Sequence, residues 1–525
     1  MMKTLPFSRL LALGLVLPFT LHAFAQESFG GIPAVERVGA QLPDAPLAVM
    51  PAVDVDALLA EDEARIAQGI KGPYRFGFDH QVELSVENSG AWHTMPNGDR
   101  VWRLAIQCPG ALSVNFEFHD YFLPEGAEVF VYNEYETLGA FTMASSGGQE
   151  SMGVTPIPGE TITIEYIEPA AVSGQGRLMI GQVTHAYRDV FGLSKGFGDS
   201  GACNNNVKCP MGDPWRDQIR SVAIIVAGGG ICTGQMVNNC AQDATPYFLT
   251  ARHCLPSNQN VNNWVYRFNW ESPACTPSQN GPTNQTVSGS QLLAQVANAD
   301  AALIRFNNPV PVGYNVFYSG WDKSGTAPTN SIAIHHPSGD VKKISFDNNA
   351  AVTATFGGAQ CWRILNWESG TTEPGSSGSG LWNQAGLLVG QLYGGQASCA
   401  NNVNDYYGKL SVSYPSFQQW LGNCGNTLLG YPINVGIDDL AGTDGGPVLA
   451  PNPTDGLVTL AWDEPLNSAG VLLVRDATGR VLQERNLPGG LDRLALDLRS
   501  YAPGLYLLET RQGGLSVTQR LVIER

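Results

Sequence analysis

Residues 247–254 read YFLTARHC, and residues 372–379 read TEPGSSGS. An apolar run leads into the first segment, which predicts that His253 lies at the end of a strand or in the loop after it. In the second segment, glycines flank Ser377 just ahead of another apolar run, Leu381-Trp382. Both segments therefore predict a polar side chain that a β-strand presents at its end.

A carboxylate accompanies these two residues. Residues 298–304 read NADAALI, so Asp300 opens a third apolar strand. The chain order His253, Asp300, Ser377 is one of the known orders of a catalytic triad. A serine hydroxyl is a weak nucleophile until a neighbouring base takes its proton, and a buried carboxylate fixes the tautomer of the imidazole. We therefore expect Ser377 to be a nucleophile, His253 its general base and Asp300 the group that orients the base.

The glycines around Ser377 also predict an oxyanion hole. They would allow the backbone N–H groups of Gly375 and Ser377 to converge on one developing negative charge. His335-His336 follows another apolar strand and is the competing base, but its surroundings are less triad-like, so we interpret this pair as structural. A cysteine peptidase that uses Cys254 is a remote alternative, since a disulfide is a better use of that thiol.

Composition limits the other classes of function. The chain has 525 residues and a net charge of −17, which argues against binding nucleic acid or an anionic membrane. Its 60 glycines and 33 prolines are typical of many short strands joined by tight turns, and so of an all-β protein. Neither a CxxC pair nor a His-x₃-His spacing occurs, so we expect no metal and no other cofactor.

The first 25 residues have the pattern of a secretory signal peptide. Lys3 and Arg9 precede the apolar run Leu10–Leu21, and Ala23-Phe24-Ala25 forms a cleavage motif. A membrane anchor is the alternative, although the apolar run is short for a span. We expect an exported protein, which agrees with nine of its ten cysteines falling between residues 203 and 424.

The chain divides into several modules. Residues 26–70 are rich in alanine and proline, and we expect them to be irregular; alternating strands follow, as in residues 112–118, so that 26–195 forms a β-sandwich. A cysteine-rich domain then spans 196–426, a linker 427–449, and a small β-sandwich 450–525.

The cysteine-rich domain resembles the lysyl endopeptidase family of trypsin-like serine proteases. The resemblance covers roughly residues 203–420 and rests on YFLTARHC and TEPGSSGS, together with IAIHHP at 332–337, GQLYGG at 390–395 and DYYG at 405–408. It implies two antiparallel β-barrels with the active site between them. The tail resembles the C-terminal sorting domains of type IX secretion through PNPTDG at 451–456 and APGLYLLE at 502–509. A carbohydrate-binding or adhesive sandwich is the alternative for this tail.

The resemblance also implies three disulfides. These pair Cys203 with Cys399, Cys209 with Cys275, and Cys232 with Cys254. Cys240, Cys361 and Cys424 are left over; as a guess we pair Cys361 with Cys424, while Cys108 stays unassigned.

The resemblance assigns the specificity pocket to Asp405. The acid of ordinary trypsin-like enzymes lies six residues before the nucleophile, where this chain has the uncharged Thr371. A desolvated carboxylate favours a cationic substrate side chain, and a narrow pocket would prefer the point charge of lysine. The chain departs from the family at Tyr393, which replaces a histidine that stacks on a tryptophan; the best match for that tryptophan is Phe356. This departure leaves arginine or mixed specificity open.

Lys195-Gly196, in the glycine-rich hinge, is the expected processing site. A lysine-specific enzyme would cut there itself and remove residues 26–195 as a propeptide, although processing at Arg188 or by another protease is an alternative. We therefore expect a monomeric, secreted preproenzyme that cleaves proteins after lysine and meets the secretion machinery through its tail. An inactive surface adhesin is the rival from another class.

Overall fold

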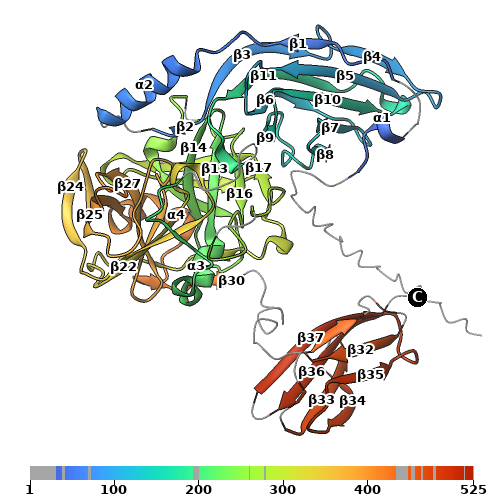
Figure 1. The fold of residues 1–525 in the computed structure, drawn as a ribbon, viewed down its shortest axis with the longest axis vertical. Coiled ribbons are helices and arrows are strands. Elements are labelled where there is room, and N and C mark those ends of the chain that lie inside the picture. The colour runs from blue at the N-terminus through green and yellow to red at the C-terminus, as the bar shows by residue number, and fades with distance from the viewer. Residues whose placement is uncertain are drawn as a thin grey trace, which may run out of the picture. The chain divides into compact units, whose positions relative to one another are not determined.

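The computed structural model describes residues 31–37, 42–68, 72–192, 200–258, 260–276, 280–432, 447–450, 454, 456–462, 465–466, 468–476, 480–512 and 515–523. The described residues are mainly β-strands, as expected, and they form two compact units (Figure 1). None of the helices within these ranges has both the length and the apolar character needed to cross a membrane. The expected signal peptide, residues 1–25, lies outside the described residues.

The N-terminal region of the first unit is a pair of sheets. One sheet has the order β1-β5-β10-β7-β8, with β4 on β5, and the other has the order β3-β11-β6-β9. Their strands are β1 (Leu47–Val49), β3 (Gly77–Ser85), β4 (Ala91–Thr94), β5 (Arg100–Gln107), β6 (Ser113–Phe122), β7 (Glu128–Tyr132), β8 (Thr137–Phe141), β9 (Met152–Pro158), β10 (Thr161–Glu168) and β11 (Arg177–Ala186). One core, which includes Trp102, Phe116 and Ile164, fills the space between the sheets.

The expectation of irregular structure for residues 26–70 is wrong. Besides the short helix α1 (Ala34–Arg37), this segment contains the 13-residue helix α2 (Val55–Ala67). Asp54 caps α2, because its carboxylate accepts a hydrogen bond from the N–H of Ala57 at 3.0 Å. The alanine content that looked irregular is helix-forming once the cap sets the start of the helix.

The cysteine-rich region contains two mainly antiparallel sheets. The first has the order β17-β16-β13-β14-β15-β19-β18, with β2 on β14. Its strands are β2 (Tyr74–Arg75), β13 (Val222–Ala227), β14 (Gly230–Met236), β15 (Tyr247–Ala251), β16 (Val265–Phe268), β17 (Thr286–Ser288), β18 (Ser290–Val296) and β19 (Ala301–Phe306). These short strands with antiparallel neighbours agree with the first of the two barrels that the family resemblance implies.

The second sheet has the order β12-β23-β22-β26-β27-β28-β25-β24, with β21 and β29 at its side. Its strands are β12 (Asn205–Asn206), β21 (Trp321–Asp322), β22 (Ser331–His335), β23 (Lys343–Asp347), β24 (Val352–Phe356), β25 (Ala359–Asn366), β26 (Gly380–Asn383), β27 (Leu388–Gly395), β28 (Val403–Lys409) and β29 (Thr427–Leu428). The helices α3 (Arg216–Ser221) and α4 (Leu410–Leu421) accompany the two sheets, and a shared core that includes Leu249, Ile334 and Trp382 joins them.

Four disulfides brace this region. They are Cys203–Cys399, Cys209–Cys275, Cys232–Cys254 and Cys240–Cys424. The first three are the pairs that the family resemblance implied. The guess of Cys361–Cys424 is wrong, since Cys424 pairs with Cys240 and Cys361 is a free, buried thiol on β25. The N–H of Cys240 donates to the carbonyl of Leu421 at the end of α4, which brings Cys240 to the segment of Cys424.

The second unit contains the C-terminal sandwich. Sheets with the orders β31-β32-β35 and β34-β33-β36-β37 enclose a core that includes Leu460, Val474 and Leu508. The strands are β31 (Val448–Ala450), β32 (Leu457–Ala461), β33 (Gly470–Asp476), β34 (Val481–Leu487), β35 (Arg493–Asp497), β36 (Gly504–Gln512) and β37 (Leu515–Ile523). The described part of the tail is thus a two-sheet β-domain.

The carboxylate of Asp79, on β3, makes the stability of the first unit depend on pH. Burial raises its pKa to about 6 although Thr184 donates a hydrogen bond to it, and the neighbouring Glu117 adds to the rise. A raised carboxyl pKa means that the folded chain holds a proton that the unfolded chain has lost. The stability contribution is therefore fully present below the unfolded-state pKa of 3.8 and is lost as the pH rises from there through about 6.

We predict that Asp79→Asn stabilises the first unit more at pH 7.5 than at pH 4.5. A shift from 3.8 to about 6 corresponds to about 3 kcal/mol over the whole titration, of which about 2 kcal/mol falls between pH 4.5 and pH 7.5. Thermal unfolding of the variant and the parent chain at both pH values measures this difference. Equal effects of the substitution at both pH values would contradict the raised pKa.

Candidate active site

His253 and Asp300 are brought together by the pairing of β15 with β19. Ala251 lies opposite Ala301 in that register, so both residues emerge from the same end of adjacent strands. The Nδ1 of His253 lies 2.6 Å from Oδ2 of Asp300, and its backbone N–H donates to Oδ1 at 3.0 Å. Asp300 is buried and adopts a left-handed backbone conformation with φ 49°. Two hydrogen bonds to one carboxylate thus fix both the position and the tilt of the imidazole.

The other ring nitrogen of His253 is available for chemistry. Among the described residues, the buried Nε2 has no hydrogen-bond partner. A base that takes a proton needs a free lone pair on the side away from its orienting carboxylate. The Nδ1 contact to Asp300 leaves Nε2 in this state.

Ser377 lies in the loop that leads into β26 of the second sheet, and hydrogen bonds hold this loop to the first sheet. The N–H of Thr233, on β14, donates to the carbonyl of Ser377 at 2.8 Å, and the Thr233 hydroxyl donates to the carbonyl of Gly375 at 2.9 Å. The Sγ of Cys254, the neighbour of His253 in the chain, lies 3.9 Å from the Ser377 carbonyl oxygen. These contacts hold the serine loop against β14, the strand that carries Cys232, the disulfide partner of Cys254.

The loop around Ser377 needs its glycines. Gly375 has φ +97° and Gly378 has φ +85°, a region that other residues rarely adopt. A Cβ on Gly378 would also lie only 2.3 Å from the carbonyl oxygen of Thr233. Within the described part of the chain, the N–H groups of Gly375 and Ser377 have no hydrogen-bond acceptor. They are thus the two donors that an oxyanion would need.

Asp405 lies in β28 and is 1% exposed. Its Oδ2 accepts hydrogen bonds from Trp367 Nε1 at 2.8 Å and from the Thr372 hydroxyl at 2.6 Å. Asp405 lines one cavity of about 610 Å³ together with Ser377 and Gly375. The structure therefore brings the expected pocket acid and the expected nucleophile to the same cavity.

Tyr393 and Phe356 form an aromatic group beside the histidine. The ring of Tyr393 stacks on that of His253 with centroids 5.7 Å apart, and Phe356 meets Tyr393 edge to face at 5.2 Å. Phe356 stacks in turn on Tyr406 at 4.3 Å. The tyrosine thus covers the imidazole from one side, although the family's histidine is absent.

The competing base, His335-His336, is fully buried. His335 Nδ1 lies 2.8 Å from the Ser376 hydroxyl and its Nε2 lies 3.1 Å from the Ser345 hydroxyl. Burial, aided by the positive charge of Lys343, lowers the pKa of His335 to about 3. His336 bonds the carbonyl of Asp340 and stacks on Trp270 at 5.6 Å. Both rings are structural, and His335 supports the residue before the nucleophile.

The sequence reasoning missed one side of the cavity. Besides residues of the cysteine-rich region, its lining includes Asp62, Arg65 and residues 72–75 from α2 and β2. The helix cap at Asp54 was the available signal for α2, but nothing local connects that helix to residues 300 positions further on. The expected processing site, Lys195-Gly196, lies outside the described residues.

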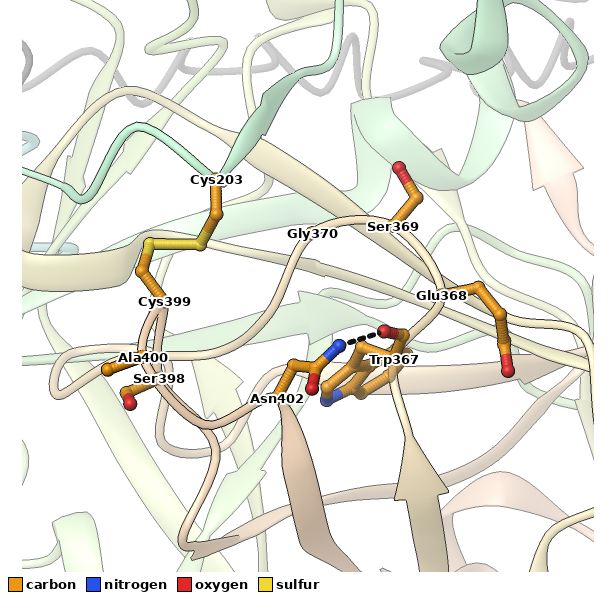
Figure 2. A pocket seen from close by; sticks show the side chains of 9 residues that line it. All are labelled: Cys203, Trp367, Glu368, Ser369, Gly370, Ser398, Cys399, Ala400 and Asn402. Carbon is orange, nitrogen blue, oxygen red and sulfur yellow. Dashed lines mark hydrogen bonds between the residues drawn. A yellow bond between two sulfur atoms is a disulfide. The ribbon is translucent and has the colours of Figure 1, made fainter.

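A second hollow of about 410 Å³ lies beside the Cys203–Cys399 disulfide (Figure 2). Trp367 forms part of its wall, and Asn402 donates to the Trp367 carbonyl at 2.6 Å. The Nε1 of the same tryptophan donates to Asp405, so Trp367 joins this hollow to the carboxylate of the expected specificity pocket. None of the residues expected to catalyse lines this hollow.

Comparisons with known proteins agree with this geometry. Residues 197–408 match the family model for the lysyl endopeptidase C-terminal domain. The lysyl endopeptidase of Pseudomonas aeruginosa is 30% identical over 362 residues, which cover 63% of this chain and 77% of that protein. The chain belongs to the lysyl endopeptidase family. As a member of this family it is a trypsin-like serine endopeptidase.

The tail also matches a known domain. Residues 448–524 match the family model for the secretion system C-terminal sorting domain, so this lysyl endopeptidase family member is a secreted or surface-associated protein.

Two solved structures are similar to the chain as well. Human heparin binding protein is 14% identical, with a TM-score of 0.30 over 40% of this chain and 94% of that one. Glu endopeptidase is 16% identical, with a TM-score of 0.28 over 43% of this chain and 97% of that one.

Substitutions of the two candidate bases, His253 and His335, should have different effects on catalysis. We expect His335→Asn to lower kcat, because it removes a support of the serine loop, and to leave the pH profile of kcat/KM unchanged between pH 5 and 9, because His335 is neutral there. His253→Asn should lower kcat by about 10⁴-fold or more. Steady-state hydrolysis of a short peptide ester across this pH range measures both. If the acidic limb of the pH profile shifts in His335→Asn, then His335 rather than His253 is the general base, and the assignment of this role to His253 is wrong.

Proposed function

We propose that the protein is a self-processed proenzyme whose mature form hydrolyses peptide bonds on the C-terminal side of lysine. The observation that carries the proposal is the shared cavity, in which the buried Asp405 lies with Ser377 and Gly375. A buried carboxylate in the cavity of the nucleophile favours a cationic substrate side chain such as that of lysine.

The chain's own residues account for the proposed chemistry. Ser377 Oγ attacks the carbonyl carbon while Nε2 of His253 takes the hydroxyl proton. The carbonyl oxygen becomes an oxyanion that accepts hydrogen bonds from the N–H groups of Gly375 and Ser377. The intermediate collapses, the C–N bond breaks, and His253 returns the proton to the leaving amine. Water then repeats the sequence on the acyl-enzyme and frees Ser377.

Asp300 supports this cycle without touching the substrate. Its two hydrogen bonds to His253 keep the Nδ1–H in place and stabilise the imidazolium that forms in each half-reaction. Tyr393 covers the ring and limits access of water to it. Because Tyr393 replaces the family's histidine, mixed lysine and arginine specificity is the second candidate.

The way in which Asp405 is held supports the proposed preference for lysine. Trp367 and Thr372 both donate to Oδ2, which places the carboxylate at one fixed point. A guanidinium that binds in bidentate fashion donates to both carboxylate oxygens, whereas a lysine ammonium can bind through a single carboxylate oxygen. The occupied Oδ2 therefore favours the ammonium group.

The proenzyme part of the proposal rests on residues 26–195. Residues from α2 and β2 line the cavity that holds Ser377, so this region stands where a substrate would bind. Just beyond the proposed cut at Lys195-Gly196, the Ser200 hydroxyl donates to Asp340 at 2.5 Å and the N–H of Gly201 to Glu373 at 3.0 Å. These bonds would anchor the new N-terminal segment beside the serine loop. The sorting domain would meet the secretion machinery.

We predict that Asp405→Asn lowers kcat/KM for lysyl substrates by about 100-fold or more, since it leaves the ammonium group in a desolvated pocket without a countercharge. A norleucyl substrate, which has no charge, should be cleaved at nearly the same rate by both enzymes. Matched lysyl, arginyl and norleucyl esters measure this. Equal losses on all three substrates would mean that Asp405 is structural.

A second prediction concerns processing. Secreted wild-type protein should begin at Gly196, and Ser377→Ala should retain residues N-terminal to Gly196, because the cut needs the nucleophile. Intact mass and N-terminal sequencing measure both products. Identical N-termini in the two proteins would rule out self-processing.

A further inference from the structure

A short strand of the N-terminal region is joined to the sheet that carries His253. Tyr74 and Arg75 pair antiparallel with Ile231 and Gly230 at the start of β14 (Figure 1). The pairing continues beyond β2, since the N–H groups of Phe76 and Gly77 both donate to the carbonyl of Gly229. β2 therefore occupies a strand edge that would otherwise be open to another extended peptide.

This strand edge lies on the leaving-group side of the cleft. The residue after Ile231 is Cys232, whose disulfide partner Cys254 is the neighbour of His253. Because His253 returns its proton to the leaving amine, the part of a substrate that follows the cut bond must lie on the histidine side. Gly72, Pro73, Tyr74 and Arg75 line the same cavity as Ser377. They thus border the cavity on the side where the leaving peptide would lie.

A buried carboxylate holds this strand in place. Asp62 on α2 accepts hydrogen bonds from Arg75 Nε at 2.6 Å, the Tyr187 hydroxyl at 2.8 Å and Arg188 at 3.0 Å. Its side chain is 7% exposed. Burial alone would raise the pKa of Asp62, but the hydrogen bonds from Arg188, Tyr187 and Arg75 outweigh it and lower the pKa. Asp62 therefore stays ionised and ties α2, β2 and the end of β11 together.

Further hydrogen bonds join the N-terminal region to the cysteine-rich region, and none of them depends on the chain being continuous at residue 195. The amide of Asn115 donates to the Gly228 carbonyl at 3.2 Å, and that of Asn263 donates to Glu117 at 2.8 Å. The Ser288 hydroxyl donates to the Gly153 carbonyl at 2.9 Å. A cut near residue 195 would leave all of these bonds intact.

We propose that residues 72–75 form an inhibitory strand in the leaving-group half of the cleft, latched by Asp62, so that the propeptide still blocks the enzyme after the cut at Lys195-Gly196. The inference rests on the proposed function and adds its regulation. Release of the strand, rather than the first cut, becomes the step that makes the enzyme active. The propeptide then acts as a non-covalent inhibitor of its own protease.

The latch can be tested with two neighbouring carboxylates. Asp62→Asn removes the buried charge, whereas Glu61→Gln is the control, because Glu61 bonds the same Arg75 at 3.3 Å but its side chain is 53% exposed. Self-cut wild type and Glu61→Gln should hydrolyse a lysyl ester with a lag and gain at least 10-fold in specific activity on dilution. Asp62→Asn should be active without a lag at the undiluted concentration.

Hydrogen exchange gives a readout that needs no activity. In the Ser377→Ala chain, the amides of residues 229–231 and 75–77 should be protected, and they should exchange at least 10-fold faster with Asp62→Asn but not with Glu61→Gln. Full activity of wild type immediately after the cut, or unchanged protection in Asp62→Asn, would overturn the inference. If the enzyme freed of its propeptide fails to cleave lysyl esters while the strand edge is protected as described, the proposed function fails and the docking of the strand stands.

Discussion

The two hydrogen bonds from Thr233 to the serine loop are the interaction on which the site depends. His253 and Asp300 are fixed by one sheet, and Ser377 is fixed by the other. Thr233, on β14 of the first sheet, bonds the carbonyls of Ser377 and Gly375. This contact sets the distance between the two halves of the site, and the Cys232–Cys254 disulfide, one residue from both Thr233 and His253, stiffens the same point.

Much of the site could be predicted from local sequence. The apolar runs before His253 and after Asp300 are β15 and β19, and the glycines around Ser377 adopt the backbone that only glycine favours. These features are local, since a strand end and a positive φ each require particular residue types. The match to the lysyl endopeptidase family supplied the rest of the fold, because periodicity alone cannot say which strands pair.

What the sequence did not predict depends on contacts between distant residues. The sequence does not say which of Cys361 and Cys240 pairs with Cys424; the contact between Cys240 and the end of α4 decides it. Helix α2 lies in a segment whose alanines looked irregular, and its role depends on Asp62 meeting Tyr187 and Arg188 more than a hundred residues later. In the structure β2 occupies the edge of β14, and under the proposed processing a leaving peptide would take the same place in the mature enzyme.

The central claim is that Ser377 is a nucleophile that His253 activates. The most direct measurement is fluorophosphonate labelling of the enzyme freed of its propeptide, followed by mass spectrometry of its peptides. We predict a single adduct on Ser377, none in Ser377→Ala, and labelling slowed by about 10³-fold or more in His253→Ala. An adduct on another residue, or labelling at the same rate without His253, would contradict the account.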